Sequence, residues 1–377
     1  MADDLVNVAV VGLGQGLENV YVTLHHPRYR LRAVCDTNPA PYDWITGRAR
    51  LEDAGVDISS FPSHVRLAEE SRNHPDIKDV EYIPEFKDVL ARDDIDAVML
   101  ILPDPLHEQC TIEALEAGKY VVCTKPMADT IESAFRIAEA AKRHEGHYML
   151  GFQISNGAFA RTVLEVVASG VLGQPRQIRF DYHRHPWRAM HRFKNSAVDG
   201  AMVKEGTHWL DLIHRLNGQL PWRAIAGFGG SEVLGDMLEF EDNGVVVIDY
   251  EGGFRAAHTY TYYRRTQGPE EDFLLVGDKG TLRGTFSQLR LDSDAERRTI
   301  EIPPKAMPAE HHYGYVAMHD EFARMVLDGQ EPYSNWRNGL ENMLTCHGAQ
   351  LAVSENRMVR REELAELDWR RNARLSG

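Results

Sequence analysis

The chain has 377 residues, of which 43% are hydrophobic and 26% are charged, and its formal net charge is −15. This length exceeds one ordinary core and suits two domains, and the composition is typical of a globular protein. The acidic charge argues against a nucleic-acid partner, because neutralising phosphates requires clustered Lys and Arg. The sequence has no signal-peptide pattern and no run of about 20 apolar residues, so we expect a cytoplasmic protein without a membrane partner.

The four cysteines, Cys35, Cys110, Cys123 and Cys346, are scattered along the chain. They have neither the close pairing of a zinc site nor the density of a disulfide framework. Three of them stand in apolar surroundings, where a buried free thiol is the ordinary interpretation. We therefore predict no metal site.

The first 150 residues alternate short apolar segments with helical ones. Strands are expected at residues 6–11, 30–35, 94–103, 120–123 and 147–152, and helices at residues 107–117 and 130–144, with an earlier helix ending near residue 25. Strands that alternate with helices form a parallel sheet with helices on both faces. Residues 1–150 are therefore predicted to form a doubly wound α/β domain.

The pattern changes after residue 150. Strands are expected at residues 176–183, 222–231, 233–241, 244–251, 254–263 and 272–277, and helices return at residues 313–328 and 337–355. Consecutive strands without intervening helices form antiparallel sheets. Residues 151–377 are therefore predicted to form an α+β domain on a large, mostly antiparallel sheet with one open face.

A glycine-rich turn, Gly12-Leu13-Gly14-Gln15-Gly16, follows the first strand and opens a helix, and Asp36 ends the second strand. Glycines let the backbone approach a pyrophosphate, the helix N-terminus attracts that anion, and the acid can bond a ribose hydroxyl. The third glycine of the usual spacing would fall on Leu17, with Gly16 one place early. The context predicts a dinucleotide-binding Rossmann domain, and the alternative is a glycine turn in another doubly wound fold.

Asp36 also bears on the choice of dinucleotide. Its carboxylate would repel a 2′-phosphate, and neither Thr37 nor Asn38 supplies the arginine that usually accompanies NADP. We expect NAD, with NADP the less favoured cofactor.

Two further segments follow predicted strands at their carboxyl ends, where ligands of open α/β sheets bind. The first runs from Pro103 to His107, and the second is Thr124-Lys125-Pro126. We expect Pro103, His107, Thr124, Lys125 and Pro126 to line the cofactor site. The alternatives are a helix-start histidine with satisfied hydrogen bonds and a surface lysine.

A third cluster of polar residues lies in the second half of the chain. On a helix, Lys204, His208 and Asp211 share one face, since they are spaced by four and three residues. A histidine can transfer a proton near neutral pH, and a lysine can hold a hydroxyl or act as a base. The alternative is a core histidine bonded to Asp211.

Residues 183–194 concentrate cations and histidines in an otherwise acidic chain. A basic cleft attracts anions. We expect Arg184 and Lys204 to bind substrate oxygens and Trp187 to stack on a ring of the substrate, so an anionic substrate is favoured. An exposed hairpin or a subunit contact is the alternative.

Together these motifs resemble the glucose-fructose oxidoreductase / inositol dehydrogenase family (Gfo/Idh/MocA), and the resemblance covers essentially the whole chain. It implies that Lys125 lies near the reacting carbon, that His208 is an acid or base, and that the protein forms homodimers or homotetramers. Two residues depart from the family pattern. Thr124 replaces the usual glutamate, and Lys204 replaces the aspartate of polyol dehydrogenases, so an aspartate–histidine pair cannot be carried over.

The expected function is that of an NAD(P)-dependent dehydrogenase acting on CH–OH groups, which reversibly transfers a hydride between nicotinamide and a secondary alcohol or ketone of a sugar, sugar acid or polyol. Lys125, His208 and Lys204 are the expected catalytic residues. One alternative is a redox-neutral lyase or glycosidase that retains NAD and oxidises a sugar transiently. The other is a non-catalytic dinucleotide sensor, against which the presence of Lys125 and His208 argues.

Overall fold

The computed structural model describes residues 5–50, 62–186, 200–238, 240–265, 271–302 and 314–365. The chain divides into two compact units. The first contains Met1–Ala128, Arg136–Gln153 and Lys305–Gly339, and the second contains Asp129–Phe135, Ile154–Pro304 and Leu340–Gly377. A single boundary at residue 150 would assign helix α11 (Tyr315–Asp328) to the second domain, whereas this helix packs in the first unit.

The first unit is built on six parallel strands in the order β3-β2-β1-β4-β5-β6. The strands are β1 (Val6–Val11), β2 (Tyr29–Cys35), β3 (Glu81–Ile83), β4 (Ala97–Leu100), β5 (Tyr120–Thr124) and β6 (Tyr148–Gly151). Every residue of β4 and β6 is buried, as expected for strands covered on both faces. This order is that of the dinucleotide-binding fold, and the predicted doubly wound sheet is confirmed.

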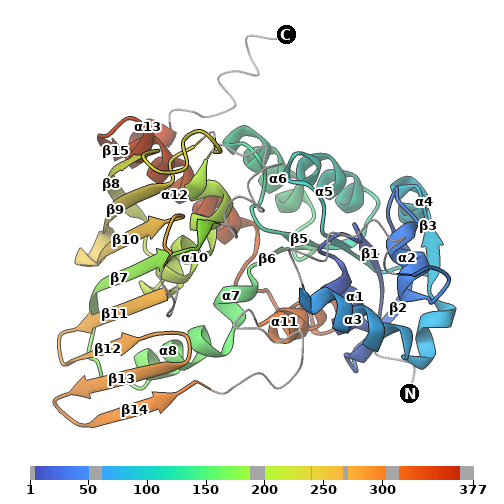
Figure 1. Ribbon diagram of the computed structural model, residues 1–377, viewed down its shortest axis with the longest axis horizontal. Coiled ribbons are helices and arrows are strands. Elements are labelled where there is room, and N and C mark those ends of the chain that lie inside the picture. The colour runs from blue at the N-terminus through green and yellow to red at the C-terminus, as the bar shows by residue number, and fades with distance from the viewer. Residues whose placement is uncertain are drawn as a thin grey trace. The chain divides into compact units, whose positions relative to one another are not determined.

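Helices lie on both faces of this sheet (Figure 1). They are α1 (Leu17–His25), α2 (Ala40–Ile45), α3 (Pro62–Arg72), α4 (Phe86–Leu90), α5 (His107–Glu116), α6 (Ile131–Arg143) and α11, with the 3-10 turns η2 (Pro75–Asp79) and η3 (Asp104–Leu106). Met318 and Phe322 of α11 join the core that Val10 and Val20 form. A segment more than 300 residues along the chain thus completes the core beside β1.

The second unit is built on nine strands in the order β14-β13-β12-β11-β7-β10-β9-β8-β15. They are β7 (Pro175–His183), β8 (Trp222–Gly230), β9 (Asn243–Tyr250), β10 (Arg255–Thr261), β11 (Glu271–Gly277), β12 (Gly280–Gly284), β13 (Gln288–Ser293), β14 (Arg297–Glu301) and β15 (Met358–Arg360). Only β7 and β10 pair in parallel, so the predicted mostly antiparallel sheet is also confirmed.

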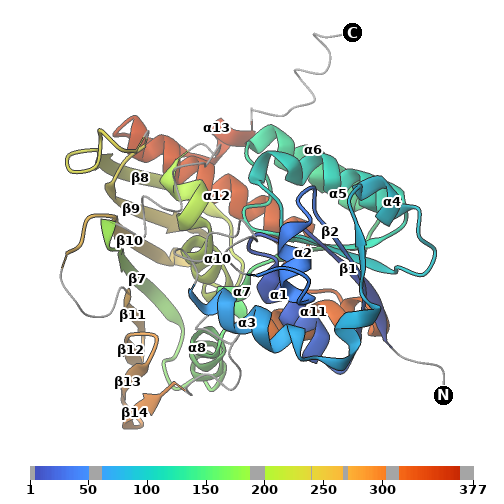
Figure 2. The same ribbon diagram turned by 45° about the vertical axis from the view of Figure 1, so that its right-hand side comes forward.

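Helices cover one face of the nine-stranded sheet (Figure 2). The unit contains α8 (Ala158–Ala168), α10 (Thr207–Leu216), most of α12 (Trp336–Ser354) and α13 (Arg361–Ala365), with part of α7 (Gln153–Asn156) and the turn η5 (Glu251–Gly253). Trp209 of α10 stacks on Phe180 of β7 with their ring centroids 4.7 Å apart. This apolar contact fixes α10, and hence the residues next to Trp209, against the sheet.

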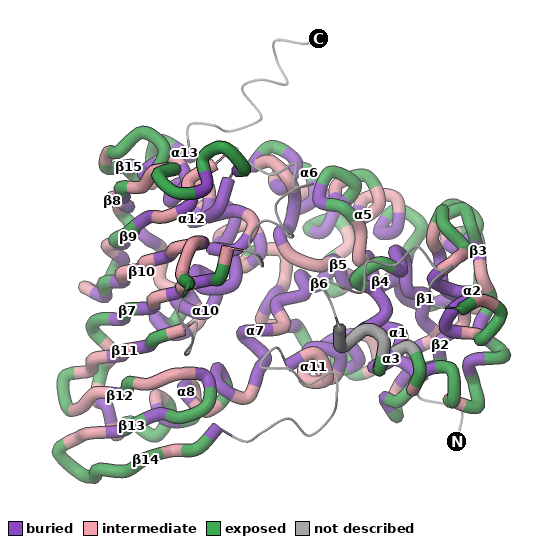
Figure 3. The backbone as a smooth tube through the Cα atoms, in the orientation of Figure 1, coloured by how far each residue is buried: buried purple, intermediate pink, exposed green. Residues whose placement is uncertain are grey.

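The other face of the sheet exposes large apolar side chains. Phe228 of β8 is 64% exposed and stands opposite Val245 of β9 in the strand register, and Val247 and Met358 are exposed on the same side. Edge strand β14, in contrast, is mostly exposed (Figure 3), and the residues that it exposes are mainly charged. The contiguous apolar surface formed by Phe228, Val245, Val247 and Met358 is typical of a protein–protein contact.

The strand expected at residues 233–241 is wrong. Among its described residues the backbone turns instead of extending, because the buried carboxylate of Asp242 accepts hydrogen bonds from the Val233 and Leu234 backbone N–H groups at 2.7 and 2.5 Å. This local capture competes with strand pairing. The alternating apolar residues Val233 and Met237 are consequently exposed.

Two buried histidines make the fold sensitive to acid. Burial lowers the pKa of His258 to about 4, while burial and the nearby His26 lower that of His319 to about 3. Each ring makes a neutral hydrogen bond, His258 Nδ1 to Phe180 O at 2.9 Å and His319 Nε2 to Asn19 Oδ1 at 3.0 Å. Both groups are therefore neutral in the folded protein at pH 7.

We expect these histidines to destabilise the protein as the pH falls. An unfolded histidine has a pKa of about 6.5. The contribution of each of the two histidines to the free energy of unfolding is therefore complete above about pH 6.5 and declines below it, by about 2 kcal/mol for each at pH 5. Urea unfolding at pH 7 and pH 5 would measure this. His258→Asn and His319→Gln should each remove about that much of the pH dependence. A pH dependence in both variants equal to that of the unmodified protein would contradict the assignment.

Candidate functional site

The turn between β1 and α1 has no room for side chains at two of its glycines. Gly12 has a φ of +90°, and a Cβ there would lie 2.1 Å from Ile101 O, while a Cβ on Gly16 would lie 1.9 Å from Gly12 O. Gly14 differs, because nothing would lie within 4 Å of its Cβ. Gly16 thus gives the close packing that the usual third glycine provides, and the backbone at Gly14 and Gln15 is open to a ligand.

Asp36 is fixed onto this turn. Its Oδ2 accepts a hydrogen bond from Leu13 N at 2.6 Å, and its Oδ1 accepts one from Asn38 N at 2.8 Å. The carboxylate is half-buried, so it joins the β1–α1 turn to the segment after β2 and remains reachable. Open backbone at a helix N-terminus beside a fixed acid suits a pyrophosphate and a ribose, and the residues present fit a dinucleotide.

His107 joins the segments that follow β4 and β5. Its Nδ1 lies 2.8 Å from Pro126 O and its Nε2 lies 3.0 Å from Leu102 O, and the residue is completely buried. Burial lowers the pKa of His107, but Cys123, Asp104 and the Leu102 carbonyl outweigh burial and raise it to about 9. Two carbonyl acceptors need two N–H donors, which only the protonated ring has. This geometry favours a positioning role over direct contact with a cofactor.

Lys125 directly precedes Pro126, the residue whose carbonyl oxygen contacts His107. It follows β5 directly, it is half-buried, and the Lys125–Pro126 peptide bond is cis. Parallel strands have their carboxyl ends at one edge of the sheet, so Lys125, Thr124 and Pro103 share that edge with the glycine turn and Asp36. The first unit therefore gathers every predicted cofactor residue at one edge, with His107 buried beneath it.

The second unit holds the remaining described candidates. His208 is in the first turn of α10 and is 3% exposed, and Lys204 is half-buried. The regular α-helix expected through both residues is interrupted, because Met202–Gly206 form the π-helical turn η4. Asp211 is fully buried and accepts a hydrogen bond from Ser155 Oγ, a partner that sequence spacing did not suggest.

Arg184 differs from its expected role as a substrate ligand. It is only 3% exposed, and its Nη1 lies 3.3 Å from Oε2 of Glu205, which is equally buried in η4. Its guanidinium also lies over the Tyr182 ring, 5.1 Å from the centroid. This buried ion pair favours a structural role. Trp187, the expected stacking residue, lies outside the described residues.

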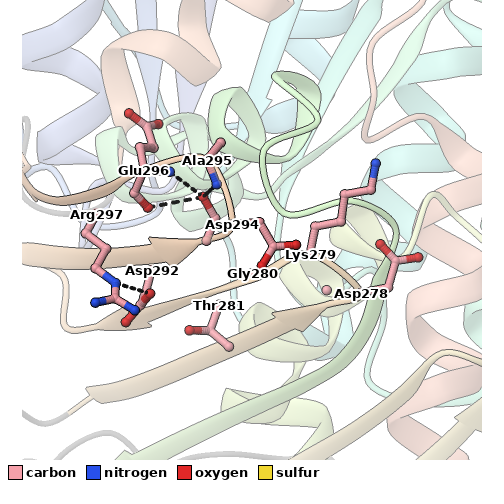
Figure 4. A pocket seen from close by; sticks show the side chains of 11 residues that line it. Asp278, Lys279, Gly280, Thr281, Asp292, Asp294, Ala295, Glu296 and Arg297 are labelled. Carbon is pink, nitrogen blue, oxygen red and sulfur yellow. Dashed lines mark hydrogen bonds and ion pairs between the residues drawn. The ribbon is translucent and has the colours of Figure 1, made fainter.

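An open hollow in the second unit contains none of the predicted residues. The β11–β12 and β13–β14 turns line it, and within it Arg297 Nε lies 2.8 Å from Asp292 Oδ1 (Figure 4). Across the described part of the chain, His, Cys, Asp and Glu side chains form no group of three that could hold a metal ion. In that same part, no helix is long and apolar enough to cross a bilayer.

Two family models match the chain. Residues 6–152 match the GFO/IDH/MocA model described as an oxidoreductase family with an NAD-binding Rossmann fold. Residues 160–283 match the GFO/IDH/MocA C-terminal domain. The first match covers all six strands of the parallel sheet, and the second covers β7 to β11 and most of β12.

Individual relatives are distant. A glycosyl hydrolase family 109 protein from Shewanella sp. (strain W3-18-1) is 28% identical over 172 residues, which are 45% of this chain and only 33% of that protein. D-xylose 1-dehydrogenase [NADP(+)] from Haloarcula marismortui is 24% identical over 288 residues, 73% of this chain and 77% of that protein.

A solved structure shares the fold across nearly the whole chain. An oxidoreductase from Agrobacterium radiobacter in complex with NAD+, L-tartaric acid and magnesium superposes with a TM-score of 0.77 at 14% identity, over 95% of this chain and 99% of that one. Because the two family matches together span more than half of the chain, the chain belongs to the Gfo/Idh/MocA family of NAD(P)-binding oxidoreductases.

Proposed function

We propose that this protein is an NAD-dependent dehydrogenase that transfers a hydride between nicotinamide and a secondary alcohol or ketone of a sugar, sugar acid or polyol. The observation that carries the proposal is the carboxyl edge of the parallel sheet. There the glycine turn with its fixed acid, Asp36, shares one edge with Lys125, a group able to transfer protons. A sensor would need the first feature and not the second.

The residues around the glycine turn would hold the cofactor. The backbone at Gly14 and Gln15 and the N-terminus of α1 would bind the pyrophosphate, and Asp36 would bind the ribose hydroxyls. The bound nicotinamide supplies a hydride acceptor or donor. Pro103, Thr124 and Pro126 would line the same edge, and His107 would keep the last of these in place.

Oxidation of an alcohol also requires a group to take the hydroxyl proton. Nζ of Lys125 or an imidazole nitrogen of His208 would accept it, and would return it in the reverse direction. Lys204 would hold substrate oxygens. Self-association, expected from the sequence, would cover the apolar surface of Phe228, Val245, Val247 and Met358.

A second candidate function is a redox-neutral one. The partial similarity to glycosyl hydrolase family 109 proteins favours it, since a glycosidase that retains NAD would oxidise its sugar only transiently. The two candidates differ in one measurable product. Incubation with simple sugars and added NAD would yield net NADH from a dehydrogenase, whereas cleavage of a glycoside without net NADH would support the alternative.

We expect tighter binding of NAD than of NADP. The Asp36 carboxylate would repel a 2′-phosphate, and Asp36→Asn removes the charge but keeps an acceptor for Leu13 N, so this variant should narrow the preference by about tenfold or more. Titration of both dinucleotides by calorimetry would measure it. Asp43→Asn, which removes another carboxylate on α2, is the matched control. Equal affinities in the unmodified protein would contradict the assignment.

Lys125→Met and His208→Gln should each lower turnover by about 10² to 10⁴, the contribution of a general acid or base. The assay is NADH formation on a confirmed substrate, with NAD affinity measured separately. His208→Gln should leave NAD affinity nearly unchanged. The exposed Lys142→Met is the control for loss of a lysine. Normal turnover in either variant would exclude that residue as the proton-transfer group.

We further expect an acidic sugar to be preferred to its neutral counterpart. Lys204 supplies a cation beside His208, and the similar A. radiobacter structure contains an acid, although the similar H. marismortui enzyme is named for a neutral sugar. Matched acidic and neutral sugars should be compared in the wild-type protein and in Lys204→Met. Loss of the preference in the variant supports the role of Lys204. A preference of the wild-type protein for the neutral sugar, or unchanged kinetics of Lys204→Met on the acidic sugar, would exclude this role of Lys204.

A further inference from the structure

The turn η4 is an unusual path for the backbone. A π-helical turn is rare, and such turns often occur at functional sites. Here the turn contains Lys204 and ends one residue before Thr207 and two before His208. An α-helical path through the same residues would change the direction of Lys204 relative to His208. Contacts with residues outside η4 must therefore keep its backbone open, that is, in the π-helical conformation.

The first such contact is at the start of the turn. Met202 N donates a hydrogen bond to Gln350 Oε1 at 3.2 Å, and Gln350 Nε2 donates to Glu241 Oε2 at 2.8 Å. Gly200, with a φ of +104°, makes room for this amide, because a Cβ there would lie 2.3 Å from Gln350 Oε1. Gln350 of α12 thus occupies the backbone donor with which the turn begins.

The second contact is at the end of the turn and is reciprocal. Thr207 Oγ1 donates to Asn342 Oδ1 at 2.6 Å, and Asn342 Nδ2 donates to Thr207 O at 3.0 Å. Cys346 Sγ lies 3.5 Å from the same Asn342 oxygen. Thr207 and Asn342 are 0% and 1% exposed, so water does not compete for these bonds.

The two amides stand on one rigid element. Asn342 and Gln350 are eight residues apart on α12, about 12 Å along the helix axis. One helix therefore holds the backbone on both sides of η4. Between these points, the buried Glu205 side chain is paired with Arg184, which supports the middle of the turn. Polar contacts this deeply buried rigidify a structure when their bonds are satisfied.

We propose that Asn342 is a positioning residue for His208, and that together with Gln350 it keeps η4 open so that Lys204 and His208 keep their relative directions. This inference rests on the proposed function, because it assigns those two side chains a place in the reaction. Asn342 acts only through the Thr207 hydroxyl and carbonyl. It need not touch substrate or cofactor.

The first test is kinetic and uses an amide on the same helix as a control. Asn342→Leu removes both bonds to Thr207 at similar volume and should lower kcat by as much as about 10²-fold, the effect of a small misplacement, with a far smaller change in KM. Thr207→Ser keeps the hydroxyl and should retain kcat. Asn338→Leu removes a side chain bonded to Tyr333 O in the first unit and should also retain it.

The second test needs no substrate. In protein labelled with ¹³C-histidine, the His208 signal, identified by its loss in His208→Gln, should change its titration curve in Asn342→Leu and not in Asn338→Leu. If the wild-type protein turns over no sugar, the proposed function fails and this test still stands. If Asn342→Leu does not fold, Thr207→Val, which replaces only the hydroxyl with a methyl group, should show a smaller change of the His208 titration curve in the same direction. Unchanged kcat and titration in a folded variant, or equal losses in Asn338→Leu, would overturn the proposal.

Discussion

The turn after β1 is tightly packed, and the geometry of the carboxyl edge of the parallel sheet depends on this packing. Gly12 and Gly16 have no space for a Cβ, because the backbone of Ile101 and of Gly12 itself lies where those atoms would be. That approach brings the N-terminus of α1 to the carboxyl edge of the sheet. It also places Leu13 N within hydrogen-bond distance of Asp36, so steric exclusion at two positions sets the location of a charged group on the neighbouring strand.

In the second unit, polar side chains around the η4–α10 segment are buried and bonded to other protein groups instead of to water. Thr207, Asn342, Glu205 and Asp211 are all buried, and each has a polar partner within its own unit. Removing one partner from such a pair leaves the other unsatisfied, which costs more than the bond itself contributes. The surroundings of His208 are for that reason specified by many residues that cannot themselves contact a ligand.

The architecture was largely predictable because burial on both faces produces continuous apolar strands. β1, β4 and β5 were located in this way, and the glycine turn and Asp36 followed from them. Hairpin strands β12–β14 were not predicted, because charged residues such as Arg290 and Arg297 alternate with few buried ones. The strand assigned to 233–241 failed because one carboxylate, Asp242, captured two backbone donors, which periodicity does not reveal.

The candidate site shows a similar division. The tight turn at Gly12 and the position of Asp36 beside it could be predicted from their spacing. Residues whose role depends on a distant partner could not. Arg184 suggested a ligand because it stands in a cationic segment, and only the fold reveals that Glu205 is beside it. Asn342 gave no signal, since its partner Thr207 is 135 residues away in the chain.

The wide turn η4 shows why spacing alone gives an incomplete description of a helical site. Lys204, His208 and Asp211 satisfy the spacing of one α-helical face, so the sequence contains no indication that the helix is interrupted. Asp211 is buried against Ser155, while Lys204 stays half-exposed on the turn. At the position where polyol dehydrogenases have an aspartate, this chain has Lys204, and the turn that contains it is held in place by side chains of α12. A change of charge at that position is thus joined to a specific backbone geometry, and the two should be considered together when the substrate is sought.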